Sequence, residues 1–466
     1  MSNRQRYHPL AIIIYLVSTF RVFLPVVLVS FIRNRGWHVV VFVVAIIALL
    51  SLFVAIYRFL TQTYQIRTDE LVLYRGLWNK NETSIPYERI QSIRQQQWFF
   101  LKPFAITSLI MDTGASGEKA EVKMPAVSNT VLQKIEALRL GEASLESEEV
   151  PNQVSGYQMQ LKDLVAYSLT EIKVMLGIVV VCVTFIQNIP TSTLDFFVQK
   201  FQSLIGVDFI LLVLVILCVM LLVFWAAMVK NAMLYYQFHA YRVDDRILIE
   251  RGLGQRRFQN IPLDKIQAIQ VKQTALRKLF GFVSVELLVI GSEETEQEKK
   301  VFLMPLIKQQ LLAEVLAELL PTYPLSQSTF SEQPKARLFY FWRWSMLVFL
   351  LVSIVTLVVS GPLFCYLIYA ACLVLLLMNQ YLKRKYQAYR LEKNQLIIRE
   401  YALFTDIRTF VLKNKIQAMT KKSSLWLEPK KIGHIRIAIK KGNHVHFIQL
   451  KYLTDTALKE LNAILR

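Results

Sequence analysis

The sequence has 466 residues, of which 54% are hydrophobic and only 19% charged. That length leaves room for about three domains, and a mean hydropathy of +0.38 favours a chain partly embedded in a membrane over a wholly soluble one. The 54 Lys and Arg against 34 Asp and Glu leave a net charge of +20, which favours anionic surfaces as partners. The four cysteines lie in apolar runs without metal-ligand spacing, which argues against a disulfide framework and a zinc site.

Apolar stretches predict three hairpins of membrane-spanning helices. A helix needs roughly 20 apolar residues to cross a bilayer, and six spans come close to this length. The stretches are 10–32 and 39–57, 174–189 and 209–229, and the long run 345–382. In the long run, Gly361 and Pro362 mark the expected reversal between two spans. The N-terminus lacks a small-residue cleavage site before the first stretch, so we expect a retained anchor.

A segment with strand-like alternation follows each hairpin, and the three segments are copies of one another. The first reads YQIRTDELVLYRGLWNKNETSIPYERIQSIRQ and the second AYRVDDRILIERGLGQRRFQNIPLDKIQAIQV. Their Arg-Gly, Ile-Pro and Ile-Gln pairs occur at identical spacing. The matched pairs are Arg75-Gly76 with Arg251-Gly252, Ile85-Pro86 with Ile261-Pro262, and Ile90-Gln91 with Ile266-Gln267.

The third segment keeps Tyr389-Arg390 and Ile416-Gln417 but departs from the other two between them. It is two residues longer between Arg399 and Ile416 and has Glu400 where the others have Gly. We therefore expect a different turn in this copy. Each copy closes with an amphipathic helical pattern, and Thr454 is the expected N-cap of the last one.

The order YR, RG, IP and IQ behind a pair of membrane helices resembles the bacterial pleckstrin-homology-like (bPH) membrane proteins. The resemblance covers nearly the whole chain. It implies, in each soluble copy, a PH-like fold of seven strands in a bent sheet closed by a C-terminal helix. It also implies a bacterial cell membrane and, as a partner, a shorter protein with a single copy, but no settled biochemical activity.

The predicted fold class is thus membrane α-helical, with six spans in three hairpins, plus three α+β PH-like domains. The expected order of segments is: hairpin 1 at 1–62, PH-like domain 1 at 63–140, an acidic linker at 141–157, an interfacial helix and hairpin 2 at 158–235, PH-like domain 2 at 236–322, a linker and hairpin 3 at 323–385, and PH-like domain 3 at 386–466. Because each domain follows an even number of spans, all three share the face of the N-terminus. Lys and Arg flank the spans mainly on that face, which predicts a cytoplasmic location.

The third domain holds 16 basic and 6 acidic residues, so half of the net charge lies there. We predict headgroup or partner binding by its three lysine pairs, against the alternative that they only reflect positive-inside bias. The pairs are Lys421-Lys422, Lys430-Lys431 and Lys440-Lys441, near Trp426. Arg21 lies inside an apolar stretch, where it faces the helix bundle, grips a lipid phosphate, or snorkels to the interface.

Motifs of nucleophilic, phosphate-binding or metal-dependent enzymes do not occur, and His444 and His446 have no third ligand nearby. We therefore expect no enzyme, cofactor or metal. The leading interpretation is a membrane scaffold that binds lipids or protein partners, in envelope integrity or resistance to membrane-active compounds. The alternative is a lipid-handling or transport protein that works through its six helices. Nucleic acid is not an expected partner, because no aromatic platform accompanies the lysines. The oligomeric state stays open.

Overall fold

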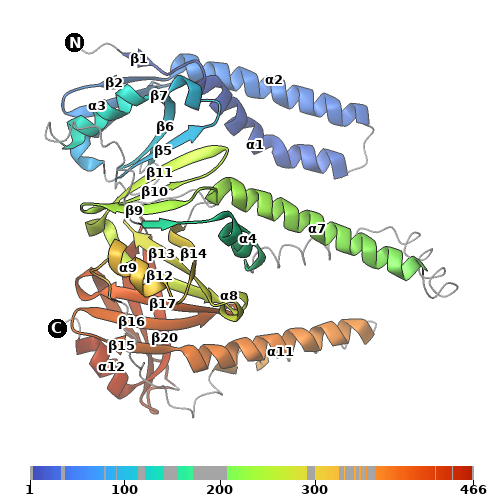
Figure 1. Cartoon of the computed structure of the whole chain (residues 1–466), viewed down its shortest axis with the longest axis vertical. Helices are drawn as coiled ribbons and strands as arrows, with labels where there is room; N and C mark the ends of the chain where they lie inside the picture. Colours follow the sequence, from blue (N-terminus) through green and yellow to red (C-terminus); the bar gives the residue numbers. More distant parts are fainter. Residues whose placement is uncertain are drawn as a thin grey trace. The chain divides into compact units, whose positions relative to one another are not determined.

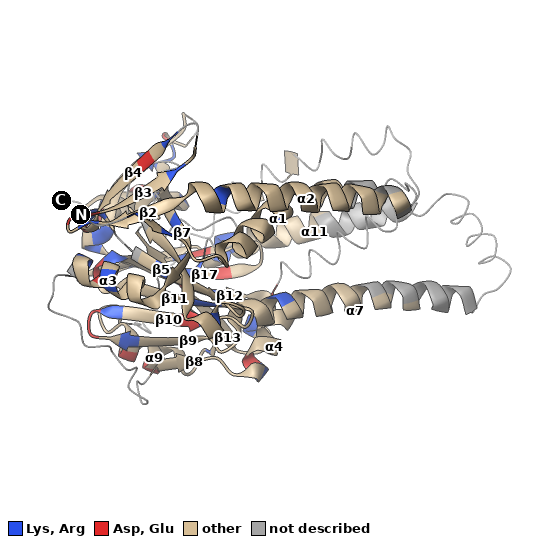
Figure 2. Cartoon of the chain, turned by 90° about the horizontal axis from the view of Figure 1, so that it is seen from above, with Lys and Arg blue, Asp and Glu red and all other residues tan. Residues whose placement is uncertain are grey.

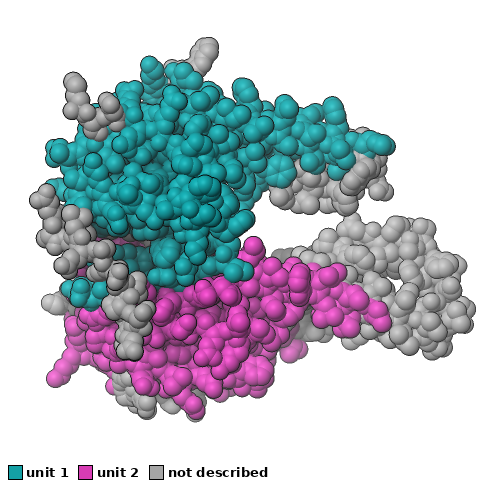
Figure 3. Space-filling model, turned by 45° about the horizontal axis from the view of Figure 1, so that its top comes forward, with its two compact units in different colours: residues 1–155, 243–261, 291–293 teal, residues 156–242, 262–290, 294–466 magenta. Residues whose placement is uncertain are grey.

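The computed structural model describes most of the chain, and its residues fall into two compact units (Figures 1 and 3). The described residues are 4–32, 37–77, 80–90, 92–113, 121–140, 156–171, 207–290, 300–324, 330, 341–342, 346–347, 350, 353, 363–425, 427–442 and 444–463. Unit 1 consists of 1–155, 243–261 and 291–293, and unit 2 of 156–242, 262–290 and 294–466.

Unit 1 contains the first copy and two strands of the second. A four-stranded antiparallel sheet has the order β1-β2-β3-β4, and β7-β6-β5-β11-β10 are neighbours in another. The strands are β1 (Gln5–Arg6), β2 (Thr63–Ile66), β3 (Glu70–Arg75), β4 (Asn81–Pro86), β5 (Ser92–Trp98), β6 (Ile106–Asp112), β7 (Glu121–Ser128), β10 (Arg246–Arg251) and β11 (Gln255–Pro262).

Three helices complete unit 1. They are α1 (Ala11–Ile32), α2 (Trp37–Thr61) and α3 (Asn129–Leu140). One buried cluster joins Tyr7 and Ala11 at the start of α1, Ala55 of α2, Leu73 of β3 and Ile135 of α3. The first hairpin is therefore packed into the same core as the soluble domain that follows it.

Unit 2 contains the rest of the second copy and the third. A six-stranded sheet has the order β14-β13-β12-β17-β16-β15, a three-stranded sheet the order β18-β19-β20, and β8 pairs with β9. The strands are β8 (Gly156–Gln158), β9 (His239–Val243), β12 (Ile266–Thr274), β13 (Phe282–Val289), β14 (Val301–Lys308), β15 (Ala388–Leu391), β16 (Gln395–Ala402), β17 (Thr405–Leu412), β18 (Ile416–Lys422), β19 (Ile432–Lys441) and β20 (His444–Thr454).

The helices of unit 2 include two long ones that extend from its sheets (Figure 1). They are α4 (Leu161–Leu169), α7 (Val207–Tyr235), α8 (Ala275–Leu279), α9 (Leu312–Leu319), α11 (Leu363–Tyr386) and α12 (Asp455–Asn462). Ala268 and Leu288 of the second copy share a buried cluster with Leu396, Val411 and Ile437 of the third. The two copies thus share part of one core.

Antiparallel sheets with a helix after the last strand agree with the expected PH-like domains. Within the described parts of the first two copies, seven strands form in each, because a short strand before the predicted membrane hairpin pairs with the first strand after it. In copy 1, Arg6 of β1 pairs with Thr63 of β2, and in copy 2, Gln158 of β8 pairs with His239 of β9. Among the described residues of copy 3, six strands form.

The described residues support one candidate membrane span by length and composition. Val40–Thr61, within α2, has a mean hydropathy of 3.0, and Ala11–Phe23 and Met220–Tyr235 are shorter apolar helical segments. Figure 2 shows that α2 and α7 carry few charged residues compared with the sheets. The stretch 174–189 and nearly all of 345–362 lie outside the described residues. Six spans in three hairpins therefore stay a prediction.

The turn of one β-hairpin explains the difference in spacing between the copies. This β-hairpin is β3–β4 in copy 1, β10–β11 in copy 2 and β16–β17 in copy 3. Gly76 and Gly252, which follow the conserved arginines, have φ of 90° and 110°, as the sequence predicts for a turn that favours glycine. In copy 3, β16 continues through Glu400, and Leu403 and Phe404 form a two-residue turn with φ of 45° and 58°. The β16–β17 hairpin of copy 3 is therefore longer and contains the two extra residues.

Thr454 caps α12, as predicted, since its Oγ1 accepts a hydrogen bond from the Ala457 N–H at 3.3 Å. We expect Thr454→Ala to lower the free energy of unfolding by about 1 kcal/mol, because the N–H loses its partner. Thr454→Ser keeps an acceptor and should stay close to the wild type. Chemical denaturation of the full chain in detergent measures both, and equal losses in the two variants would contradict the capping role.

Candidate functional site

One turn recurs in all three copies. It joins the strand that begins at or directly after the Ile-Gln pair to the next strand. We call these turns tip 1 (residues 99–105, between β5 and β6), tip 2 (275–281, between β12 and β13) and tip 3 (423–431, between β18 and β19). Each ends on a residue with positive φ: Ala105 at 51°, Gly281 at 68° and Lys431 at 54°. This shared residue aligns the three tips from their last position backwards, although tip 3 is two residues longer at its start.

Large apolar side chains project into solvent from every tip. The exposed fractions are 69% for Phe99, 59% for Phe104, 77% for Leu279, 62% for Phe280 and 86% for Leu425. A single exposed apolar residue is ordinary on a protein surface. Their recurrence at the same turn of three copies indicates a shared role for that turn.

The residue four positions before the positive-φ residue points the other way and is buried in every copy. It is Leu101 in tip 1, Arg277 in tip 2 and Leu427 in tip 3, with exposed fractions of 0%, 3% and 1%. Each tip thus combines an apolar outer surface with one inward anchor. The anchor is aliphatic in two copies and cationic in the other.

Tip 1 packs against the residues that lead into α1, the first predicted membrane helix. Leu101 belongs to the same buried cluster as Tyr7 and Ala11. The ring of Phe104 lies 6.2 Å from the ring of His8, measured between centroids. The tip therefore lies beside the start of α1.

Arg21 of α1 extends this contact. Its guanidinium carbon lies 5.8 Å from the centre of the Trp98 ring, at the end of β5 just before tip 1. A cation within about 6 Å of an indole face is attracted by the ring quadrupole. The structure thus gives Arg21 an aromatic partner that sequence reasoning missed, while binding of a lipid phosphate stays a prediction.

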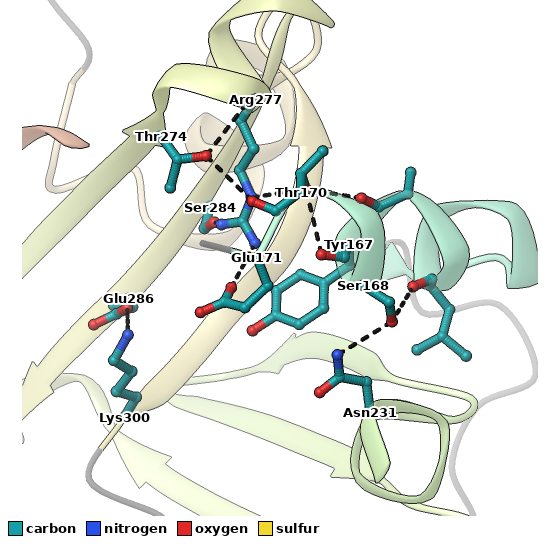
Figure 4. Close-up of polar contacts among 12 residues, drawn as sticks. Tyr167, Ser168, Thr170, Glu171, Asn231, Thr274, Arg277, Ser284, Glu286 and Lys300 are labelled. Carbon is teal, nitrogen blue, oxygen red and sulfur yellow. Dashed lines mark hydrogen bonds and ion pairs between the residues drawn. The ribbon is translucent and has the colours of Figure 1, made fainter. Parts of the chain in front are cut away.

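Tip 2 is anchored by a buried polar network around Arg277 (Figure 4). The guanidinium donates from Nε to Thr170 Oγ1 at 3.2 Å, from Nη2 to Glu171 Oε2 at 3.0 Å, and from Nη1 to Ser284 Oγ. Its carbon also lies 4.8 Å from the centre of the Tyr167 ring. Thr170 and Glu171 directly follow α4 and precede the predicted third span, so this tip too contacts a segment that leads towards the membrane.

The same network continues to the base of α7. Asn231 donates from Nδ2 to Ser168 Oγ at 3.1 Å. The ring of Tyr235 lies 5.1 Å from that of Tyr167 and 5.8 Å from that of Phe302. Polar and aromatic contacts together hold α4, α7 and the β14 strand in one arrangement.

Tip 3 repeats the contact in apolar form. Leu427 and Ile432 share a buried cluster with Phe341 and Tyr452. The rings of Phe341 and Tyr452 lie 4.9 Å apart. Phe341 precedes the long apolar run 345–382, so in each copy the tip meets the residues that lead into the predicted hairpin of that copy.

Tip 2 also touches the base of α11, which belongs to the third hairpin. Lys278 Nζ donates to the Tyr386 hydroxyl at 2.8 Å. The turn between β16 and β17 lies next to the tip, because the Ala275 N–H donates to the Phe404 carbonyl at 2.9 Å. Phe404 N–H in turn lies 3.4 Å from Asn379 Oδ1 of α11.

A second buried ionic group lies in the β12-β13-β14 region of unit 2. Glu286 accepts from Lys272 Nζ at 2.5 Å and pairs with Lys300 Nζ at 3.2 Å. Burial would raise the pKa of this carboxyl, but the two ammonium groups hold it below its ordinary value of 4.5. Burial also lowers the pKa of Lys272, against the opposing effect of Glu286. The group is therefore charged and paired at neutral pH.

The six lysines predicted as a binding patch divide into two groups. Lys421 and Lys422 end β18, and Lys430 and Lys431 close tip 3 beside the start of β19, whereas Lys440 and Lys441 end β19. Nine strand residues at about 3.3 Å each place the last pair about 30 Å from tip 3. Lys421 also pairs with Asp455 at 3.4 Å. Trp426 lies outside the described residues.

The tips were missed by sequence reasoning, although a signal exists. In copies 1 and 2 the tip sequences place a lysine among large apolar residues, FFLKPFA and ALRKLFG, where a turn would ordinarily be polar. Comparison of the copies beyond the Ile-Gln pair would have exposed this pattern. Across the part of the chain that the structure describes, no group of three or more His, Cys, Asp or Glu could hold a metal ion.

The sequence model of the bacterial PH domain matches residues 12–142, 194–321 and 346–466. These three segments cover most of the chain, so the chain belongs to the bacterial PH domain family. Each matched segment includes helix-forming residues of a predicted hairpin as well as the soluble domain behind it.

A relative of this chain is the UPF0699 transmembrane protein YdbT of Bacillus subtilis (strain 168). It is 28% identical over 356 residues, which are 70% of this chain and 71% of the relative. The relative is named as a transmembrane protein, which agrees with a membrane location for this chain. No solved structure matches the sequence.

We expect Arg277→Leu to lower the free energy of unfolding of the full chain by about 3 kcal/mol, because Glu171 loses its buried partner. The double variant Arg277→Leu with Glu171→Leu should recover most of this loss, since copies 1 and 3 hold a leucine at this position. Chemical denaturation in detergent measures both. A double variant as unstable as the single one would contradict a role confined to charge pairing.

Glu286→Gln should also destabilise the chain by about 3 kcal/mol at pH 7, since Lys272 is left buried without its counter-ion. The folded-state pKa of Glu286 lies below its unfolded value, so its contribution is complete above about pH 5 and is lost as the pH falls through the folded pKa. The difference between variant and wild type should therefore shrink as the pH is lowered. Glu314→Gln, at an exposed position of α9, is the control and should show no such pH-dependent difference.

Proposed function

We propose that this protein is a multi-pass membrane scaffold whose PH-like domains hold their tips at the membrane surface and bind anionic lipid headgroups there. One observation carries the proposal. In each copy, the tip contacts the residues leading into its own hairpin while it exposes large apolar side chains. Because these residues lead directly into a predicted membrane helix, a tip that contacts them can enter the headgroup region beside that helix.

Apolar burial supports this function. A phenyl or isobutyl group that moves from water into the interface gains roughly 25 cal/mol per Å² of buried apolar surface. The exposed residues Phe99, Phe104, Leu279 and Phe280 are therefore favoured at the acyl boundary. They would orient each domain as well as attract it.

Charge supports it too. Lys102 and Lys278 occupy the same position in tips 1 and 2, and tip 3 carries Lys430 and Lys431. Each cation near an anionic leaflet contributes about 1 kcal/mol. Each tip carries a net positive charge, and the remaining lysines of the third domain add to it there.

The wider role that fits this chemistry is maintenance of the cell envelope or resistance to membrane-active compounds, without catalysis and with the domains on the cytoplasmic face. Binding of protein partners by the same domains belongs to this proposal. The alternative, a lipid-handling or transport protein that works through its six predicted helices, draws little support from Arg21, whose guanidinium lies 5.8 Å from the Trp98 ring.

The test places an environment-sensitive fluorophore on Phe104→Cys in full-length chain whose four cysteines are replaced by serine. The labelled protein is reconstituted into nanodiscs of phosphatidylcholine with or without phosphatidylglycerol. We expect a blue-shifted emission that lipid-phase quenchers reduce, and a larger shift with the anionic lipid.

The matched control carries the label at Gln133→Cys, an exposed position on α3. This label should report water in both nanodiscs. A water-like spectrum at position 104 as well would overturn the proposed membrane contact. A blue shift that ignores phosphatidylglycerol would overturn the preference for anionic headgroups.

A further inference from the structure

Consecutive copies are joined by one strand pairing, which occurs twice. In unit 1, β5 of copy 1 pairs antiparallel with β11 of copy 2. In unit 2, β12 of copy 2 pairs antiparallel with β17 of copy 3. Each junction pairs the strand before the tip of one copy (β5 or β12) with the third strand after the predicted hairpin of the next copy (β11 or β17).

The register is the same at both junctions. Arg94 faces Gln259 in the first, and Gln270 faces Thr409 in the second. These residues are equivalent: Gln259 lies three positions before Pro262, and Thr409 lies three before Leu412, the residue in the place of that proline. The backbone hydrogen bond beyond the strands also recurs, from Phe99 N–H to Gly254 O and from Ala275 N–H to Phe404 O, both at 2.9 Å. The junction is therefore a specific interface of this domain type.

Two strands of the same kinds stand at the ends of their sheets. Among the described residues, β4 is the last strand of the order β1-β2-β3-β4, and β18 is the first of β18-β19-β20. β4 is the counterpart of β11 and β17, and β18 is the counterpart of β5 and β12. Most side chains of β18 are exposed, whereas those of β12 are nearly all buried by their neighbours.

We propose that β18 of one molecule pairs with β4 of a second copy of this chain and forms a third junction between molecules. An open strand edge offers a row of N–H and C=O groups to a partner strand. Applied to these strands, the shared register places Thr420 opposite Thr83 and Lys421 opposite Glu82. Opposite charges facing each other across a strand pair stabilise it.

Charge restricts which strand can bind. Lysines on an edge strand ordinarily discourage indiscriminate pairing. Lys421 and Lys422 therefore disfavour a basic or apolar strand, while Glu82 and Asn81 of β4 fit them. Among the described residues, Glu82 pairs with Arg67 at 3.9 Å and Lys421 with Asp455 at 3.4 Å, both longer than a close salt bridge.

A second molecule of this chain is the favoured partner because its β4 is equivalent to β11 and β17, the strands that form the junctions within the chain. Each domain follows an even number of predicted spans, so β4 of one molecule and β18 of another lie on the same side of the membrane. The pairing is head-to-tail, which leads to a ring if the rotation closes and to a row of molecules if it does not. Membrane anchoring raises the local concentration of both edges.

The experiment uses two full-length, cysteine-free chains expressed together, one with Lys421→Cys and one with Glu82→Cys, each with its own affinity tag. Directly opposed residues have Cα atoms within disulfide range. Oxidation in native membranes should link the two differently tagged chains. We expect at least about tenfold more linked dimer than for a control pair, as thiols held in register require.

The control pairs Glu82→Cys with Lys459→Cys, an exposed position on α12 that lies outside any strand. All three positions are exposed, so the variants should fold, and membrane yield checks this. Equal linkage in the two pairs would overturn the proposal. Linkage of the Lys421→Cys chain only to a different protein would overturn the choice of a second copy as partner.

Discussion

In every copy, a buried side chain at one position of the tip packs beneath the residues that lead into the hairpin of the same copy. Leu101, Arg277 and Leu427 occupy that position. A soluble domain on a flexible tether would leave its surface free to turn away from the bilayer. Here the domain and its membrane lead-in share a core, which fixes the face that each domain presents. The apolar tips and their lysines are positioned by this contact.

In copy 2, the buried side chain of the tip is an arginine, whereas it is a leucine in copies 1 and 3. Arg277 replaces the leucine and requires Glu171, Thr170 and Ser284 as partners. Removing an arginine from water is costly, and several hydrogen bonds are needed to offset the loss of hydration. In return, the arrangement is directional, since each donor of the fork has one acceptor. A leucine tolerates small shifts of the hairpin, whereas this network specifies one position of α4.

The strand junctions add a second level of order. Because β5 pairs with β11 and β12 with β17, neighbouring copies share backbone hydrogen bonds in addition to a chain connection. Such pairing uses the same edges in each copy and rests on backbone hydrogen bonds, to which the side chains on the edges add selectivity. Among the described residues, one strand of each kind stays at the end of a sheet: β4 in copy 1 and β18 in copy 3. The charges on these edges, Glu82 and Lys421, distinguish them from the internal ones.

Much of the architecture follows from the sequence alone. The spacing of the Arg-Gly and Ile-Pro pairs defines the repeat, and the positive φ of Gly76 and Gly252 and the cap at Thr454 follow from local chemistry. These features depend on residues close together in the chain, which is why pattern and propensity suffice. The pairing of Arg21 with Trp98, the separation of Lys440 and Lys441 from tip 3, and the junctions between copies depend on tertiary structure. They join residues far apart in sequence through strand edges that carry no local signature, so only the folded arrangement of strands could decide them.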